Sequence, residues 1–138
     1  MKTAVNTSAN SEYAPNLLLG LREEFEQRIL AWQTTSDNMP TIWVDRKDLT
    51  SILIYLRDKA EPRFEMLFDI TAIDERVRVH RLGQPESEFS VVYHLMSFSG
   101  NRDFRIKVPL MNADLNIPSI VSLWPSANWY ERETWDMF

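Results

Sequence analysis

The chain has 138 residues, of which 44% are hydrophobic and 25% are charged, and its formal net charge is −5. These values are typical of one globular domain, and the negative charge argues against a general nucleic-acid surface, which needs a basic footprint. The sequence contains no cysteine, which excludes disulfides, iron–sulfur clusters and zinc sites built on thiolates. No apolar run approaches the roughly 20 residues that span a bilayer.

The first third of the sequence predicts a tail, a helix and a hairpin. Residues 1–14 are small and polar without periodicity, so we expect a disordered tail before a single domain over 15–138. Apolar spacing predicts a helix over 17–25. The β-prone segments 29–35 and 41–44 flank a cluster of turn-forming residues, which predicts a β-hairpin with a longer loop.

A second helix and a third strand are predicted next. Asp45 is placed as the N-cap of a helix that runs to about Ala60, with apolar residues recurring at three and four positions. Residues 64–74 alternate as a strand does. This alternation assigns one face of that strand to Phe64, Met66, Phe68, Ile70 and Ala72.

Two further strands and two short helices complete the prediction. Residues 89–98 carry apolar side chains on both faces, which indicates a strand inside the sheet. Residues 102–108 form a half-buried strand after a short hairpin turn. A short helix is expected over 118–124, and a last helix is expected to begin at Asn128, with Glu131 completing a capping box.

These elements define the fold class. The order is α-β-β-α-β-β-β-α, which predicts an α+β domain with a mixed sheet of about five strands and helices packed against it.

Neither a metal site nor a catalytic nucleophile is predicted. The two histidines, His80 and His94, are too far apart in sequence for a paired ligand motif. The three glycines are scattered, so no phosphate-binding loop is present. Asp69 and Asp74 could serve as paired carboxylates, but a polar strand face or a cap is the commoner role for such residues. The basic segment 76–81 could bind an anion, although a solvated loop is the simpler interpretation.

The C-terminal stretch, residues 124–138, is unusual because large aromatic and charged residues are interleaved in it. Tryptophan, tyrosine and arginine dominate protein–protein hot spots, so the stretch predicts a binding surface. The alternative is an amphipathic helix that packs on the core of its own domain. Arg132 and Asp136 are one helical turn apart and could form an ion pair. The aromatic residues concerned are Trp124, Trp129, Tyr130, Trp135 and Phe138.

Residues 128–138 closely resemble the signature of the C-type subunit of bacterial NADH-quinone oxidoreductase, respiratory complex I, with its Glu-Arg-Glu-x-x-Asp-x-Phe core. The likeness extends to 68–76, 89–95 and 105–108. It is nearest to the fused C/D subunits, in which this domain forms the N-terminal part. The family signature continues with a glycine and a Gly-His-x-x-Leu-Arg-Arg segment that is absent here, so the domain is expected to be truncated at its C-terminal end.

The resemblance implies a non-catalytic structural subunit of the peripheral arm, without a cofactor of its own. Such a subunit supports electron transfer from NADH to quinone, coupled to proton translocation. The implied partners are the D-type subunit and the ferredoxin-like I-type subunit, on the cytoplasmic side of the bacterial inner membrane, with membrane association only through the complex. The implied interface residues are Trp129, Tyr130, Glu131, Arg132, Glu133, Trp135, Asp136 and Phe138.

Two alternatives remain open from the sequence. Domains of this type also occur as scaffolds in membrane-bound energy-converting hydrogenases. The chain could also be a small free-standing enzyme that uses Asp69 or Asp74 as a base.

Overall fold

The computed structural model describes residues 15–35, 37, 39–76 and 83–137, so the predicted tail over 1–14 lies outside the described residues. The described elements alternate as the sequence predicts, with one added 3₁₀ turn, and they confirm the α+β class. In chain order they are α2 (Pro15–Phe25), η1 (Glu26–Arg28), β1 (Ile29–Thr34), β2 (Pro40–Val44), α3 (Arg46–Asp58), β3 (Met66–Asp74), β4 (Phe89–Ser97), β5 (Arg102–Leu110) and α4 (Ala127–Met137).

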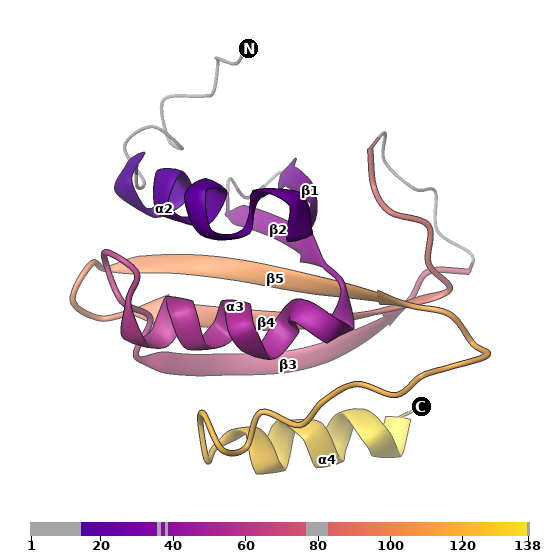
Figure 1. Cartoon of the computed structure of the whole chain (residues 1–138). Helices are drawn as coiled ribbons and strands as arrows, with labels where there is room; N and C mark the ends of the chain where they lie inside the picture. Colours follow the sequence, from indigo (N-terminus) through magenta and orange to yellow (C-terminus); the bar gives the residue numbers. More distant parts are fainter. Residues whose placement is uncertain (1–14, 36, 38, 77–82, 138) are drawn as a thin grey trace.

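The strands form one mixed sheet in the order β1-β2-β5-β4-β3. The pair β2–β5 is parallel and the other pairs are antiparallel. The predicted hairpin β1–β2 and the interior position of β4 are both confirmed. Helix α3 carries the chain from β2 across the sheet to the far edge strand β3, and Figure 1 shows α4 on the side of that edge.

One face of the sheet packs against α2 and α3. The N-cap of α3 is confirmed, because the Asp45 carboxylate accepts a hydrogen bond of 2.9 Å from the Lys47 amide. The buried apolar side chains recur at the helical spacing in α3 and at alternate positions in β4 and β5. They include Leu49, Ile52, Leu53 and Leu56 of α3, Val91, Tyr93 and Leu95 of β4, and Phe104, Ile106 and Val108 of β5.

The Tyr55 side chain of α3 reaches α2 at Gly20. A Cβ atom at this position would collide with the Tyr55 hydroxyl, and the Tyr55 ring also packs edge-on against Phe25 at 5.5 Å between centroids. Glycine lowers helix propensity, and here it leaves room for the Tyr55 hydroxyl against α2.

The predicted face of β3 is confirmed for Phe64 and Ile70 but wrong for Phe68, because the strand contains a bulge. Leu67 pairs with Leu95 but Asp69 pairs with His94, so Phe68 is an extra residue in the ladder. The bulge reverses the alternation: Leu67 and Ile70 are buried, whereas Phe68 is 47% exposed. The residues on both sides of the bulge are apolar, so the alternation of apolar and polar residues in the sequence does not reveal that the strand changes face there.

The short helix expected over 118–124 is also wrong. The segment is irregular up to a single turn, in which the amides of Leu123 and Trp124 both donate to the Ile120 carbonyl. The amide of Ile120 itself donates to the Glu131 side chain. Pro125 disfavours helical geometry at Trp124, the residue before it, so the single turn does not extend into a helix.

Candidate partner-binding site at helix α4

Helix α4 begins at Ala127, so the predicted N-cap at Asn128 is wrong. The Asn128 and Trp129 amides donate to the carbonyls of Pro125 and Ser126, as in a helix already under way. Glu131 does not reach back to close a capping box. Its carboxylate accepts bonds from the Ser119 hydroxyl at 2.7 Å and from the Ile120 amide at 2.8 Å, which ties α4 to the segment that precedes it.

The inner face of α4 covers the free edge of β3. The Thr134 hydroxyl donates to the Tyr130 carbonyl of its own helix at 2.8 Å and lies 3.4 Å from the Ile70 carbonyl of β3. Just before the helix, the Trp124 indole N–H donates to the Glu65 carbonyl at 3.1 Å. Ala127 is fully buried and Tyr130 packs partly buried against the core. An uncovered edge strand would expose its unpaired backbone groups, so α4 protects the sheet as well as extending the core.

The outer face of α4 carries two exposed tryptophans. Trp129 is 71% exposed and Trp135 is 58% exposed. The Arg132 guanidinium lies over the Trp129 ring at 5.7 Å from its centroid. Within the described part of the chain, no ion pair joins Arg132 to Asp136, so the predicted pair is not formed.

The aromatic residues of the C-terminal stretch therefore divide between the two alternatives drawn from the sequence. Trp124 is buried and Tyr130 is partly buried, so these two belong to the core. Trp129 and Trp135 lie largely in solvent, as does the charged pair of Glu133 and Asp136. Phe138, the remaining predicted interface residue, lies outside the described residues.

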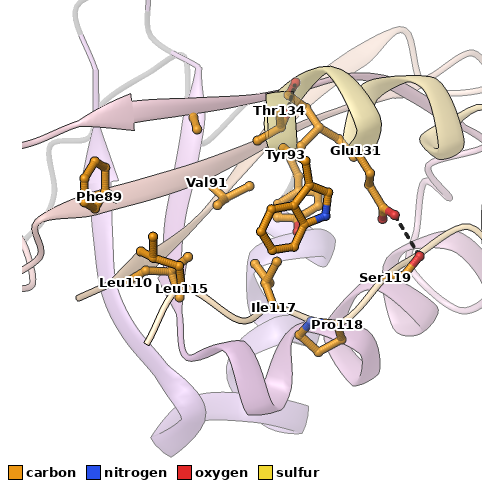
Figure 2. A pocket seen from close by; sticks show the side chains of 13 residues that line it. Phe89, Val91, Tyr93, Leu110, Leu115, Ile117, Pro118, Ser119, Glu131 and Thr134 are labelled. Atoms are coloured by element: carbon orange, nitrogen blue, oxygen red, sulfur yellow. Dashed lines mark hydrogen bonds between the residues drawn. The ribbon is translucent and has the colours of Figure 1, made fainter. Parts of the chain in front are cut away.

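An apolar cavity of about 110 Å³ lies between α4, the sheet and the segment before α4. Figure 2 shows Glu131 and Thr134 reaching it from the helix, Val91 and Tyr93 from the sheet, and Ile117 from the connecting segment. The Tyr93 side chain is almost fully buried. Burial raises the pKa of the Tyr93 hydroxyl, and the negative charge of Glu131 adds to the shift. The hydroxyl therefore stays neutral.

His94 is the histidine among the described residues, and its side chain lies on the face of the sheet opposite α2 and α3. The His94 ring packs against Phe68 at 5.0 Å between centroids, and its Nε2 lies 3.6 Å from the Asp103 carboxylate. No group of three or more potential ligands gathers among the described residues. His80 lies outside them, as does most of the basic segment around it.

Asp69 and Asp74 do not form a carboxylate dyad. They are five positions apart on β3, which separates their backbones by about 16 Å at the rise of a strand. Asp74 accepts bonds from the Arg76 guanidinium at 2.7 and 2.9 Å and from the Arg76 amide at 3.0 Å. Asp74 therefore closes a turn at the end of the strand.

The turn between Asp74 and Arg76 leads to a prediction that can be tested by measuring the pKa of the Asp74 carboxyl. The hydrogen bonds from Arg76 lower the pKa of Asp74 from 3.8 to about 2. Since the folded value lies below the ordinary one, the turn adds stability above about pH 4 and loses it as the pH falls towards 2. An NMR titration of the Asp74 carboxyl carbon should give a midpoint near 2 in the wild type. The midpoint should rise towards the ordinary value in Arg76→Ala. An unshifted wild-type midpoint would show that the turn does not form in solution.

None of the helices in the described part of the chain is long and apolar enough to cross a membrane. The residues that sequence reasoning missed are Ser119 and Ile120, which hold Glu131, and Thr134, whose hydroxyl lies beside the Ile70 carbonyl of β3. These residues contact positions far away in the chain or belong to no sequence motif, so a local sequence pattern does not predict their contacts.

Comparisons with known proteins bear on the whole chain. The family model described as respiratory-chain NADH dehydrogenase, 30 Kd subunit, matches residues 42–138. A C/D subunit of NADH-quinone oxidoreductase from Acidiphilium cryptum is 58% identical over 106 residues, which are 77% of this chain and 18% of that protein. The C/D subunit of Psychrobacter cryohalolentis is 50% identical over 133 residues, 96% of this chain and 22% of the relative.

The C/D subunit of Chromohalobacter salexigens is 46% identical over 139 residues, which cover 100% of this chain and 23% of that protein. The chain thus spans about a fifth of the length of the curated relatives that it matches.

Proposed function

The chain belongs to the family of the 30 Kd subunit of respiratory-chain NADH dehydrogenase, as its resemblance to the C-type and fused C/D subunits indicated, and on that premise we propose that it is a non-catalytic assembly domain of NADH-quinone oxidoreductase. In this role it supports electron transfer from NADH to quinone, coupled to proton translocation, without holding a cofactor. Its place is in the peripheral arm, on the cytoplasmic side of the bacterial inner membrane.

The observation that carries this proposal is the outer face of α4. Trp129 and Trp135 are large, exposed and held on a helix that is tied to the preceding segment through Glu131 and packed on the core through Ala127 and Tyr130. Exposed aromatic side chains beside charged residues are typical of protein interaction sites. The anchored helix holds them in place before binding, which lowers the entropic cost of association.

The proposed interface consists of the outward residues of the family signature. Trp129 and Trp135 would be the anchors, and Arg132, Glu133 and Asp136 would form the polar rim. Tyr130 and Glu131 support the helix from the inside, and Phe138 remains a proposed member. The partners on this proposal are the D-type subunit, in the same chain or a separate one, and the ferredoxin-like I-type subunit.

The alternative roles find less support. The relatives at 46–58% identity are all called NADH-quinone oxidoreductase subunits, which favours this complex over an energy-converting hydrogenase. The separation of Asp69 from Asp74 along β3 removes the paired-carboxylate geometry, and the bonds from Arg76 occupy Asp74. A small enzyme built on these aspartates would have to work with Asp69 alone.

The proposal is tested by co-purification of the chain with the other subunits of NADH-quinone oxidoreductase from the same organism. We expect Trp129→Ala and Trp135→Ala each to weaken the association by about 2 kcal/mol, because truncating a hot-spot tryptophan has at least this effect. Leu19→Ala, at an exposed apolar residue on α2 (56% exposed), is the matched control and should co-purify normally. Normal assembly of both tryptophan variants would contradict the proposed interface.

A further inference from the structure

The cavity beneath α4 is built for an apolar group. Its walls come from β3, β4, the end of β5, the connecting segment and α4, and most of the side chains are aliphatic or aromatic. The carboxylate of Glu131 is already engaged by Ser119 and Ile120, so it offers a visiting polar group little. The hydroxyls in the lining are those of Tyr93, Ser119 and Thr134, and the last two already donate hydrogen bonds within the chain.

The volume of the cavity matches a single large side chain. At about 110 Å³, it is comparable to the roughly 150 Å³ apolar cavity that stays dry and accepts benzene. The cavity also reaches the surface, because Pro118, Ser119 and Trp135 in its wall are solvent-exposed. A group can therefore enter from outside without unfolding the sheet.

The entrance adjoins the outer face of α4. Trp135 belongs both to the wall of the cavity and to the exposed aromatic face of the helix. Among the charged residues exposed on α4, Glu133 and Asp136 outnumber Arg132, and the chain as a whole carries a charge of −5. Glu133 and Asp136 lie within two residues of Trp135 on the helix, so complementarity favours basic side chains beside the inserted group.

We propose that the protein partner of α4 inserts one large apolar side chain, flanked by lysine or arginine, into the cavity between α4 and the sheet. This inference rests on the proposed function and names the anchor that the interface uses. Hot spots on one protein pair with pockets on the other, and filling the cavity restores the packing contacts that its walls lack. Trp135, which lines the cavity, then excludes water around the inserted group.

The test fills the cavity from within. Ala72 lines it from β3, and Ala72→Leu places carbon atoms where the partner's side chain would go. We expect association with the other subunits to weaken about tenfold or more, while the melting temperature is kept. Ala113→Leu adds the same carbon atoms at an exposed turn outside the cavity and should bind as the wild type does.

Benzene is the probe for the cavity itself. In the wild-type chain it should shift the NMR signals of the Val91 and Ile117 methyl groups, and in Ala72→Leu these shifts should vanish. Should Ala72→Leu fail to fold, Leu115→Phe fills the same space from the connecting segment. Folded cavity-filled variants that assemble as tightly as the wild type would overturn the proposal, whether or not benzene binds.

The outcomes also separate this inference from the proposed function. If Trp129→Ala weakens assembly and Ala72→Leu does not, the interface stands and the inserted side chain is overturned. If neither variant affects assembly, both the proposed interface and the inserted side chain are contradicted. If Ala72→Leu abolishes only self-association in sedimentation experiments, the occupant is a second copy of this chain, which also overturns the proposal.

Discussion

Replacing Phe104 by alanine is expected to lower the free energy of unfolding by about 3–5 kcal/mol, the range for removing a fully buried aromatic ring. Phe104 lies in β5, the middle strand of the sheet, and is 0% exposed. Its ring packs against Phe64 at 5.8 Å between centroids. The truncation leaves a cavity at the centre of the core that the surrounding strands cannot close. Denaturant unfolding of the purified chain measures the change.

Phe98 provides the matched control for this prediction. It is the same residue type, placed just after β4, but it is 66% exposed. We expect Phe98→Ala to change the free energy of unfolding by less than about 0.5 kcal/mol. Similar losses for the two variants would mean that the sheet does not bury the face assigned to Phe104.

Replacing Glu131 by alanine is expected to cost about 2–3 kcal/mol, because a hydrogen bond to a charged group contributes about 1.5–3 kcal/mol. The carboxylate bonds both the Ser119 hydroxyl and the Ile120 amide, and Ile120 is fully buried. The lost partner therefore leaves a buried donor unsatisfied. Faster hydrogen exchange confined to α4 and the segment before it should accompany the loss, since the helix is released from its anchor.

Two further variants sharpen the test of Glu131. Glu131→Gln keeps a carbonyl acceptor without the charge and should lose less stability than the alanine variant. Glu133→Ala removes an exposed carboxylate from the same helix and should change stability by no more than about 0.5 kcal/mol. Equal effects of Glu131→Ala and Glu133→Ala would show that α4 is not held by this carboxylate.

The succession of helices and strands could be predicted from the sequence because each element carries its own periodic signal. The apolar spacing of α3, its Asp45 cap and the two-sided apolar pattern of β4 are local features, and the structure confirms all three. The order of strands within the sheet has no such signal. The parallel pairing of β2 with β5 joins segments about sixty residues apart, and only the packing of the whole domain selects it.

The errors have physical causes that lie outside local patterns. The bulge at Phe68 depends on which residues of β4 pair with β3, so alternation alone assigns Phe68 to the wrong face. Asn128 and Glu131 have the spacing of a capping box, but the Ile120 amide, eleven positions earlier, takes the carboxylate instead. The C-terminal signature indicates a binding surface, whereas the division into the buried Trp124 and the exposed Trp129 requires the fold.

The most direct test of the central claim is to measure both the amount of assembled NADH-quinone oxidoreductase in membranes and its turnover per complex, for the wild type and for Trp129→Ala. An assembly domain without a catalytic role should affect only the amount. We therefore expect Trp129→Ala to lower the abundance of the complex and its total activity in proportion, with unchanged turnover per assembled complex. A normal amount of complex with a reduced turnover would contradict the non-catalytic assembly role.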